Sequence, residues 1–208
     1  MQNKRNKIND NIMKIKLLVC TLIVLCISFF KIRSNTSVIN INSSLNDLYK
    51  TELIDEVDSY IEKYAKKSKM SADNIVELAL KYDYDIPLML AQFHLESHFA
   101  SFGVAHKTNN VANVGNMDDG TMLYKFKHPD DSVEPYIKLM INDYLKDKSV
   151  DDLLNNFVNY RNQRYASDVL YENKVKQKRN YIIKNTKIYK LQKSINNLKI
   201  VNKYELEY

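Results

Sequence analysis

The stretch PLMLAQFHLESHFASFG, residues 87–103, decides how the rest of this 208-residue sequence is interpreted. Its apolar residues recur at helical spacing and fall on one stripe: Leu88, Ala91, Leu95 and Phe99. Asp85 can cap the start of such a helix, and Pro87 falls in the first turn, where a missing N–H costs nothing. The sequence therefore predicts a helix that presents one carboxylate, Glu96, near its end.

Two histidines in the same stretch, His94 and His98, suggest a zinc site at first sight. Histidines four residues apart share a helix face and can both bind zinc. In a zinc protease the glutamate directly follows the first histidine, whereas Glu96 lies two residues after His94, a rotation of roughly 200° on a helix. The glutamate would point away from the histidines, and His106 is no clear third ligand. We therefore expect no metal and no cofactor.

Glu96 is flanked by the apolar residues Phe93, Leu95 and Phe99. Burial among them would raise the pKa of its carboxyl and keep it protonated near neutral pH. A protonated carboxyl is what glycosidic cleavage needs in order to protonate the leaving oxygen. Spacing alone is a weak indication, because a lone glutamate on a helix is commonly a solvated surface residue.

An asparagine-rich loop, residues 103–120, follows this helix. Three amides there could bind sugar hydroxyl and N-acetyl groups, or simply form turns and caps: Asn109, Asn110 and Asn113. The alternating residues 121–128 predict a short β-hairpin. Four residues of this region are candidates for the opposite wall of a cleft: Asp118, Asp119, Tyr124 and Phe126. Of these, Phe126 could instead belong to the core.

The rest of the chain is predicted to be helical, since three glycines and three prolines force few turns. The predicted helices are residues 45–64, 72–82, 130–145, 150–160 and a long basic helix or pair from residue 171. Ser71 can cap the helix at 72–82, and Asp131 or Ser132 the helix at 130–145. The expected fold class is α+β and mostly α, with one small β-hairpin. The predicted organisation is an export segment (1–33), a polar linker (34–44), the main domain with a helical N-terminal extension (45–186) and a basic helical tail (187–208).

Residues 1–33 are typical of an export signal, with a basic start followed by the apolar run 17–30. Fourteen residues are fewer than the roughly 20 that span a bilayer, and no small-residue cleavage site follows. The segment is therefore either a cleaved signal peptide or an uncleaved membrane anchor, with the domain outside the membrane. Both cysteines, Cys20 and Cys26, lie in this run, so the exported domain has no disulfide.

The net charge of +6 comes entirely from residues 1–33, which hold seven Lys or Arg residues and one Asp. We therefore expect no nucleic-acid binding, and a monomer. Residues 174–203 contain ten basic and no acidic residues. This tail could contact an anionic polymer or could form a solvated helix face.

Four blocks of the sequence resemble, in order, the glucosaminidases, family 73 of the glycoside hydrolases. The blocks are PLMLAQFHLESHFASFG (87–103), NNVANVG (109–115), YKFKHPDDSVEPYIKLM (124–140) and RYASDVLYENKV (164–175). Each block alone is only moderately specific, but four in the same order are a strong resemblance, which covers roughly residues 72–185.

The resemblance implies a lysozyme-like fold and a bacterial or phage enzyme that faces the cell wall. Its substrate would be the glycan strands of peptidoglycan, cut at the β-1,4 bond on the reducing side of N-acetylglucosamine. Glu96 matches the general acid of the family, and Tyr136 matches a helix tyrosine that lines the catalytic centre, although it could be a packing residue. Asp118 or Asp119 corresponds by region to the second carboxylate.

The sequence departs from the family after Glu96, where His98 and Ala100 stand in place of the usual glycines. This change puts the fine geometry of substrate binding in doubt but not the identity of the acid. Two other functions remain open. One is a lytic transglycosylase, which would leave anhydro-sugar ends, and the other is a non-catalytic glycan-binding or virion structural protein.

Overall fold

The computed structural model describes residues 41–115 and 124–206. Contacts divide the chain into two units, residues 47–197 and residues 1–46 with 198–208. In the second unit, the described residues 41–46 and 198–206 are helical. All the buried hydrophobic residues of the described chain lie within residues 47–197.

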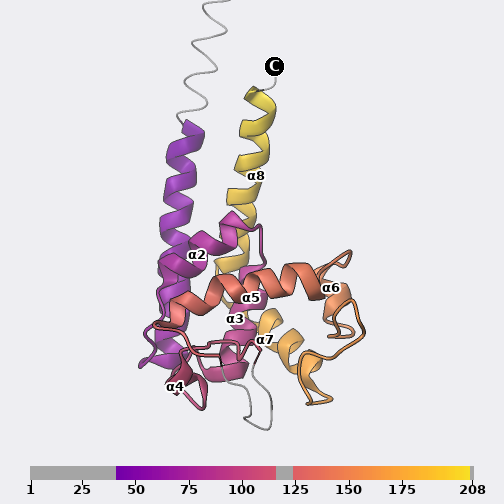
Figure 1. The fold of residues 1–208 in the computed structure, drawn as a ribbon. Helices are drawn as coiled ribbons and strands as arrows, with labels where there is room; N and C mark the ends of the chain where they lie inside the picture. The colour runs from indigo at the N-terminus through magenta and orange to yellow at the C-terminus, as the bar shows by residue number, and fades with distance from the viewer. Residues whose placement is uncertain (1–40, 116–123, 207–208) are drawn as a thin grey trace, which may run out of the picture. The chain divides into compact units, whose positions relative to one another are not determined.

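The elements, shown in Figure 1, are a helix at residues 41–65, α2 (Ala72–Lys81), α3 (Ile86–Ser97), α4 (Ala105–Thr108), η1 (Pro129–Ser132), α5 (Val133–Leu139), η2 (Met140–Tyr144), α6 (Val150–Leu153), α7 (Tyr171–Asn185) and α8 (Ile188–Leu206).

Helix α3 is the central element of the 47–197 unit, because ten of its twelve residues are buried. It begins as predicted: the Asp85 carboxylate accepts a 2.6 Å hydrogen bond from the N–H of Leu88, and Pro87 lies in the first turn. It packs against α7, whose buried residues are Tyr171, Val175 and Ile182. Since each fully buried aliphatic side chain stabilises by roughly 1.5–3 kcal/mol, this pair anchors the core.

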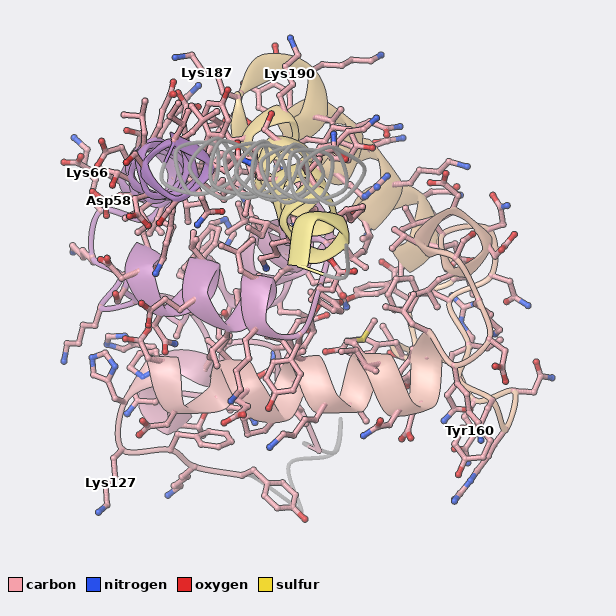
Figure 2. The ribbon with its side chains drawn as sticks, turned by 90° about the horizontal axis from the view of Figure 1, so that it is seen from above. Asp58, Lys66, Lys127, Tyr160, Lys187 and Lys190 are labelled. Carbon is pink, nitrogen blue, oxygen red and sulfur yellow. The ribbon has the colours of Figure 1, made fainter. Side chains whose placement is uncertain are left out.

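Helices α2 and α5 lie side by side (Figures 1 and 2). The Ser71 hydroxyl caps α2, as predicted, by accepting a 3.3 Å hydrogen bond from the N–H of Asn74. The N–H of Ser71 in turn donates to the Asp130 carboxylate at 2.9 Å, which ties the start of α2 to η1. Lys127 and Tyr160 lie toward opposite ends of the continuous helix formed by α5 and η2 (Figure 2).

Helix α8 contributes three apolar side chains to the core and is linked to the helix at residues 41–65. The buried residues of α8 are Ile188, Leu191 and Ile195. Just before α8, the Lys187 ammonium pairs with Glu52 at 2.7 Å. Residues 188–197, which the sequence analysis placed in the basic helical tail, lie within the 47–197 unit.

Three predicted helix boundaries differ from the structure. Residues 41–44, expected in the polar linker, are helical. The helix predicted from residue 130 begins as a 3-10 turn capped by His128, not by Asp131 or Ser132; the Asp131 carboxylate instead accepts from the His128 N–H at 3.0 Å. The helix predicted at 150–160 ends at Leu153, after which residues 154–164 turn back and form an isolated bridge between Val158 and Arg164.

The mostly helical character of the fold is confirmed, whereas the predicted β-hairpin is not seen among the described residues. Residues 124–128 are irregular and form no strand. They are held to α4 by a 2.8 Å hydrogen bond from the Phe126 N–H to the Thr108 carbonyl. The start of the predicted hairpin, residues 121–123, lies outside the described residues, as do Asp118 and Asp119.

In the described ranges, no helix has the length and apolar character needed to cross a membrane. The predicted export segment, residues 1–33 with its apolar run 17–30, lies outside these ranges. That prediction therefore stays a prediction.

Candidate active site

Glu96 lies in the last turn of α3, and its half-buried carboxylate is held on both oxygens. Oε1 accepts a 2.7 Å hydrogen bond from the hydroxyl of Tyr171, the first residue of α7. Oε2 accepts a 3.3 Å hydrogen bond from Nδ2 of Asn113, which comes from the asparagine-rich loop. The carboxylate thus sits where the central helix, α7 and this loop meet.

A chain of buried polar groups continues from Tyr171 into the core. Nε2 of Gln92 donates to the Tyr171 hydroxyl at 3.0 Å. The Tyr136 hydroxyl donates to Oε1 of Gln92 at 2.5 Å, and the hydroxyls of Tyr84 and Tyr136 are 2.8 Å apart. Gln92 and Tyr136 are fully buried. Since unpaired polar groups are costly in such a place, each member depends on the next.

Burial raises the pKa of the tyrosine hydroxyls in this chain. Desolvation is the largest cause for Tyr84, Tyr136 and Tyr171, and the negative charge of Glu96 adds to it for Tyr171. All three hydroxyls therefore keep their protons near neutral pH and act as neutral donors. Tyr136, predicted to line the catalytic centre, lies inside the core and is linked to Glu96 through Gln92 and Tyr171.

A second tyrosine of the same region, Tyr165, supports the site from the other side. Its ring stacks on Tyr171, with centroids 5.5 Å apart and planes 15° apart. Its hydroxyl donates to the Ala112 carbonyl at 2.8 Å, which fixes the loop that carries Asn113. Asp168, by contrast, pairs with Lys174 at 2.5 Å and accepts a hydrogen bond from the N–H of Leu170, just before α7.

The predicted sugar-binding asparagines have different roles in the structure. Asn110, fully buried, bonds the backbone of Val114 in both directions, accepting at 3.0 Å and donating at 2.9 Å. Nδ2 of Asn109 donates to the carbonyls of Phe126 and Lys127 at 3.0 Å each. These two residues build the loop, and Asn113 is the one whose amide reaches Glu96.

The aromatic candidates lie after the undescribed segment. Tyr124 is 53% exposed and packs over Gly115, where an added Cβ would be 2.7 Å from its ring. Gly115 also has a φ of +69°, so both close approach and backbone conformation favour glycine. Phe126 is half-buried. The structure thus brings Asn113 to Glu96, while Asp118 and Asp119 lie outside the described residues.

The buried Ser97 closes the turn between α3 and the loop, a role the sequence did not reveal. Its hydroxyl donates to the Val111 carbonyl at 2.6 Å and accepts from the N–H of Ala100 at 2.8 Å. The three residues after it, His98 to Ala100, all have φ between 47° and 58°. This left-handed conformation favours glycine, so a glycine would fit at His98 and at Ala100 without backbone strain.

His94 has different neighbours from Glu96. Its Nδ1 lies 3.2 Å from the Tyr60 hydroxyl and its Nε2 lies 3.4 Å from the Lys178 ammonium. Burial, followed by the positive charge of Lys178 and then by His98, lowers the pKa of His94 to about 4. The ring is therefore neutral at pH 7. In the part of the chain that the structure describes, no three potential ligands are grouped to hold a metal ion.

Four functional candidates were not found from the sequence: Tyr84, Gln92, Tyr165 and Tyr171. Gln92, Tyr165 and Tyr171 belong to blocks that resemble the glucosaminidases, so their place in those blocks was the available signal. Tyr84 carries no such signal, because only the folded chain brings it to Tyr136.

Comparison with known families agrees with this geometry. The family model for glucosaminidase, described as mannosyl-glycoprotein endo-beta-N-acetylglucosaminidase, matches residues 72–186. No curated protein and no solved structure matched the chain. The matched segment is more than half of the chain and includes Glu96, Gln92, Tyr136 and Tyr171. The chain therefore belongs to the glucosaminidase family.

Proposed function

We propose that the chain is a peptidoglycan hydrolase, an endo-β-N-acetylglucosaminidase that cuts the β-1,4 bond on the reducing side of N-acetylglucosamine. The observation that carries this proposal is the setting of Glu96. Within the segment that matches the family, it is the carboxylate at the end of the central helix, and Tyr171 and Asn113 hold its two oxygens. A carboxyl with a fixed orientation suits proton delivery to a glycosidic oxygen.

In the proposed reaction, protonated Glu96 gives its proton to the leaving oxygen as the bond to the anomeric carbon breaks. Positive charge then develops on the sugar ring. Either a water activated by a second carboxylate or the N-acetyl group of the substrate completes the displacement, and water finally gives the new reducing end. Asp118 or Asp119 is our candidate for the second carboxylate.

Substrate contacts are proposed on the side of Glu96 that the loop borders. Tyr124 offers an exposed ring for a sugar face, and the Asn113 amide lies at hydrogen-bond distance from the acid. We further propose that the chain is an exported monomer, held at the membrane through residues 17–30 or released from it, because its substrate lies outside the membrane.

The test is product analysis after incubation of the purified chain with peptidoglycan. Mass spectrometry should find fragments with reducing N-acetylglucosamine ends that carry the mass of one added water. Anhydro ends would instead identify a transglycosylase, and binding without cleavage would identify a non-catalytic glycan-binding protein. A Glu96→Gln preparation made in the same way controls for contaminating hydrolases.

A further inference from the structure

The hydrogen-bond chain behind Glu96 has a single direction, which follows from the chemistry of its members. An amide oxygen only accepts, so the Tyr136 hydroxyl donates to Gln92, and the proton between the two hydroxyls must come from Tyr84. An amide nitrogen only donates, so Tyr171 accepts from Gln92 and uses its own proton on Glu96. Every proton in the chain therefore points toward the carboxylate.

From this geometry we propose that Tyr84 and Tyr136 are positioning residues that set the orientation and acidity of the Glu96 carboxyl through Gln92 and Tyr171. The inference rests on the proposed function, since it assigns remote residues to the same acid. Along this series of hydrogen bonds, the Tyr136 hydroxyl is three bonds away from the Glu96 carboxylate and the Tyr84 hydroxyl is four bonds away.

The Tyr84 end of this hydrogen-bond series is held by α8, a helix outside the segment that matches the family. Nε2 of the buried Gln192 donates to the Tyr84 carbonyl at 2.7 Å, and its Oε1 accepts from the Ile86 N–H at 3.0 Å. Next to this clasp, Arg179 of α7 pairs with Asp85 at 2.8 Å. The backbone of Tyr84 therefore has little freedom to move, and its side chain starts the polar chain from a fixed point.

The effect on acidity follows from cooperativity between successive hydrogen bonds. A hydroxyl or amide that accepts a hydrogen bond becomes a stronger donor, and the low dielectric of a core enhances this. Tyr165 and Tyr171 face Glu96, and burial keeps both neutral by raising the pKa of their hydroxyls. Removal of one hydroxyl therefore weakens every later donor and destabilises the Glu96 carboxylate relative to its protonated form.

The sign of the expected change is therefore fixed. In a Tyr136→Phe variant the titration midpoint of Glu96 rises, because its charged form has lost support. A general acid works while protonated, so the alkaline limb of the pH–kcat profile moves to higher pH. The same change in Tyr84→Phe is smaller, because one more bond separates this residue from the carboxylate.

The experiment compares Tyr136→Phe, Tyr84→Phe and the control Tyr60→Phe in the 208-residue chain. Tyr60 is a matched control because it is also buried, and its hydroxyl makes a hydrogen bond with His94, which is not a member of the series that leads to Glu96. Kinetics on soluble peptidoglycan fragments should show kcat reduced about tenfold in Tyr136→Phe and several-fold in Tyr84→Phe, with KM within about twofold. The alkaline limb should rise by about 0.1–0.6 pH unit in Tyr136→Phe, and Tyr60→Phe should leave both unchanged.

A second readout does not depend on activity. Carbon-13 NMR titration of the Glu96 carboxyl, assigned with Glu96→Gln, should show the same order of midpoints. Equal midpoints and pH profiles in all three variants would overturn the inference, whatever their thermal stability. If the titration midpoint of Glu96 shifts but the protein cleaves no glycan, the role of the hydrogen-bonded tyrosines stands and the proposed function is rejected. If Tyr136→Phe fails to fold, Tyr84→Phe carries the test.

Discussion

Helix α3 has two polar faces, one with Gln92 and Glu96 and the other with His94, and they differ in whether their surroundings favour a charged side chain. On one face, Gln92 and Glu96 accept or relay hydrogen bonds that all point toward a carboxylate. On the other face, His94 lies between the Tyr60 hydroxyl and the Lys178 ammonium, and its pKa is lowered. The first face supports a charged carboxylate and fixes its orientation, whereas the second disfavours a charge on the imidazole of His94. Gln92 and Glu96 are four residues apart, as are His94 and His98. The same spacing thus places a candidate acid on one face and a packing histidine on the other.

The largest effect is expected at Tyr171, whose hydroxyl donates a hydrogen bond directly to Glu96. Tyr171→Phe removes the 2.7 Å hydrogen bond to Oε1 and leaves Nε2 of Gln92 without its acceptor. We expect kcat to fall by about 10- to 100-fold, since the carboxyl loses its fixed orientation. The measurement is steady-state cleavage of soluble glycan fragments, with circular dichroism to confirm folding. A folded variant with wild-type kcat would show that Tyr171 does not position the acid.

The buried, neutral state of His94 should make the free energy of unfolding depend on pH in the acid range. Because the pKa of His94 is about 4 in the folded chain and about 6.5 when unfolded, the unfolded chain takes up the proton first. Stability is therefore full above about pH 6.5 and is lost as pH falls toward 4. We expect this loss to amount to about 1–2 kcal/mol.

The check is chemical denaturation of wild type and His94→Gln at pH 7 and pH 4. Carboxylates also titrate in this range, so the difference between the two proteins isolates the histidine. The variant should lose about 1–2 kcal/mol less of its unfolding free energy between the two pH values. An equal loss in both proteins would contradict the buried neutral state.

The smallest effect is expected at His98, the residue that caps the C-terminal end of α3. This exposed residue has a φ of 47°, and glycine adopts that conformation without a Cβ clash. His98→Gly should raise the unfolding free energy by about 0.5–1 kcal/mol and leave kcat unchanged. Thermal unfolding measures the gain. A lower melting temperature would show that the ring, near Phe102, contributes more than the strain costs.

Local signals in the sequence predicted the helices but not the support of the acid. Ser71 and Asp85 cap α2 and α3 as predicted, because a cap depends only on residues a few positions away. The polar chain joins residues that are 44 to 79 positions apart, and no local pattern encodes such pairing. Leu153 ended its helix early because residues 154–164 turn back, which helical spacing does not foresee.

The central claim is that Glu96, and not the histidine pair beside it, performs the chemistry. The most direct measurement compares Glu96→Gln and His94→Gln for peptidoglycan cleavage at pH 7, with the exposed Glu62→Gln as a control. We predict that Glu96→Gln loses at least about 10²–10⁴ of the rate, while the other two variants stay near wild type. Retained activity in a folded Glu96→Gln, or an equal loss in a folded His94→Gln, would contradict the assignment.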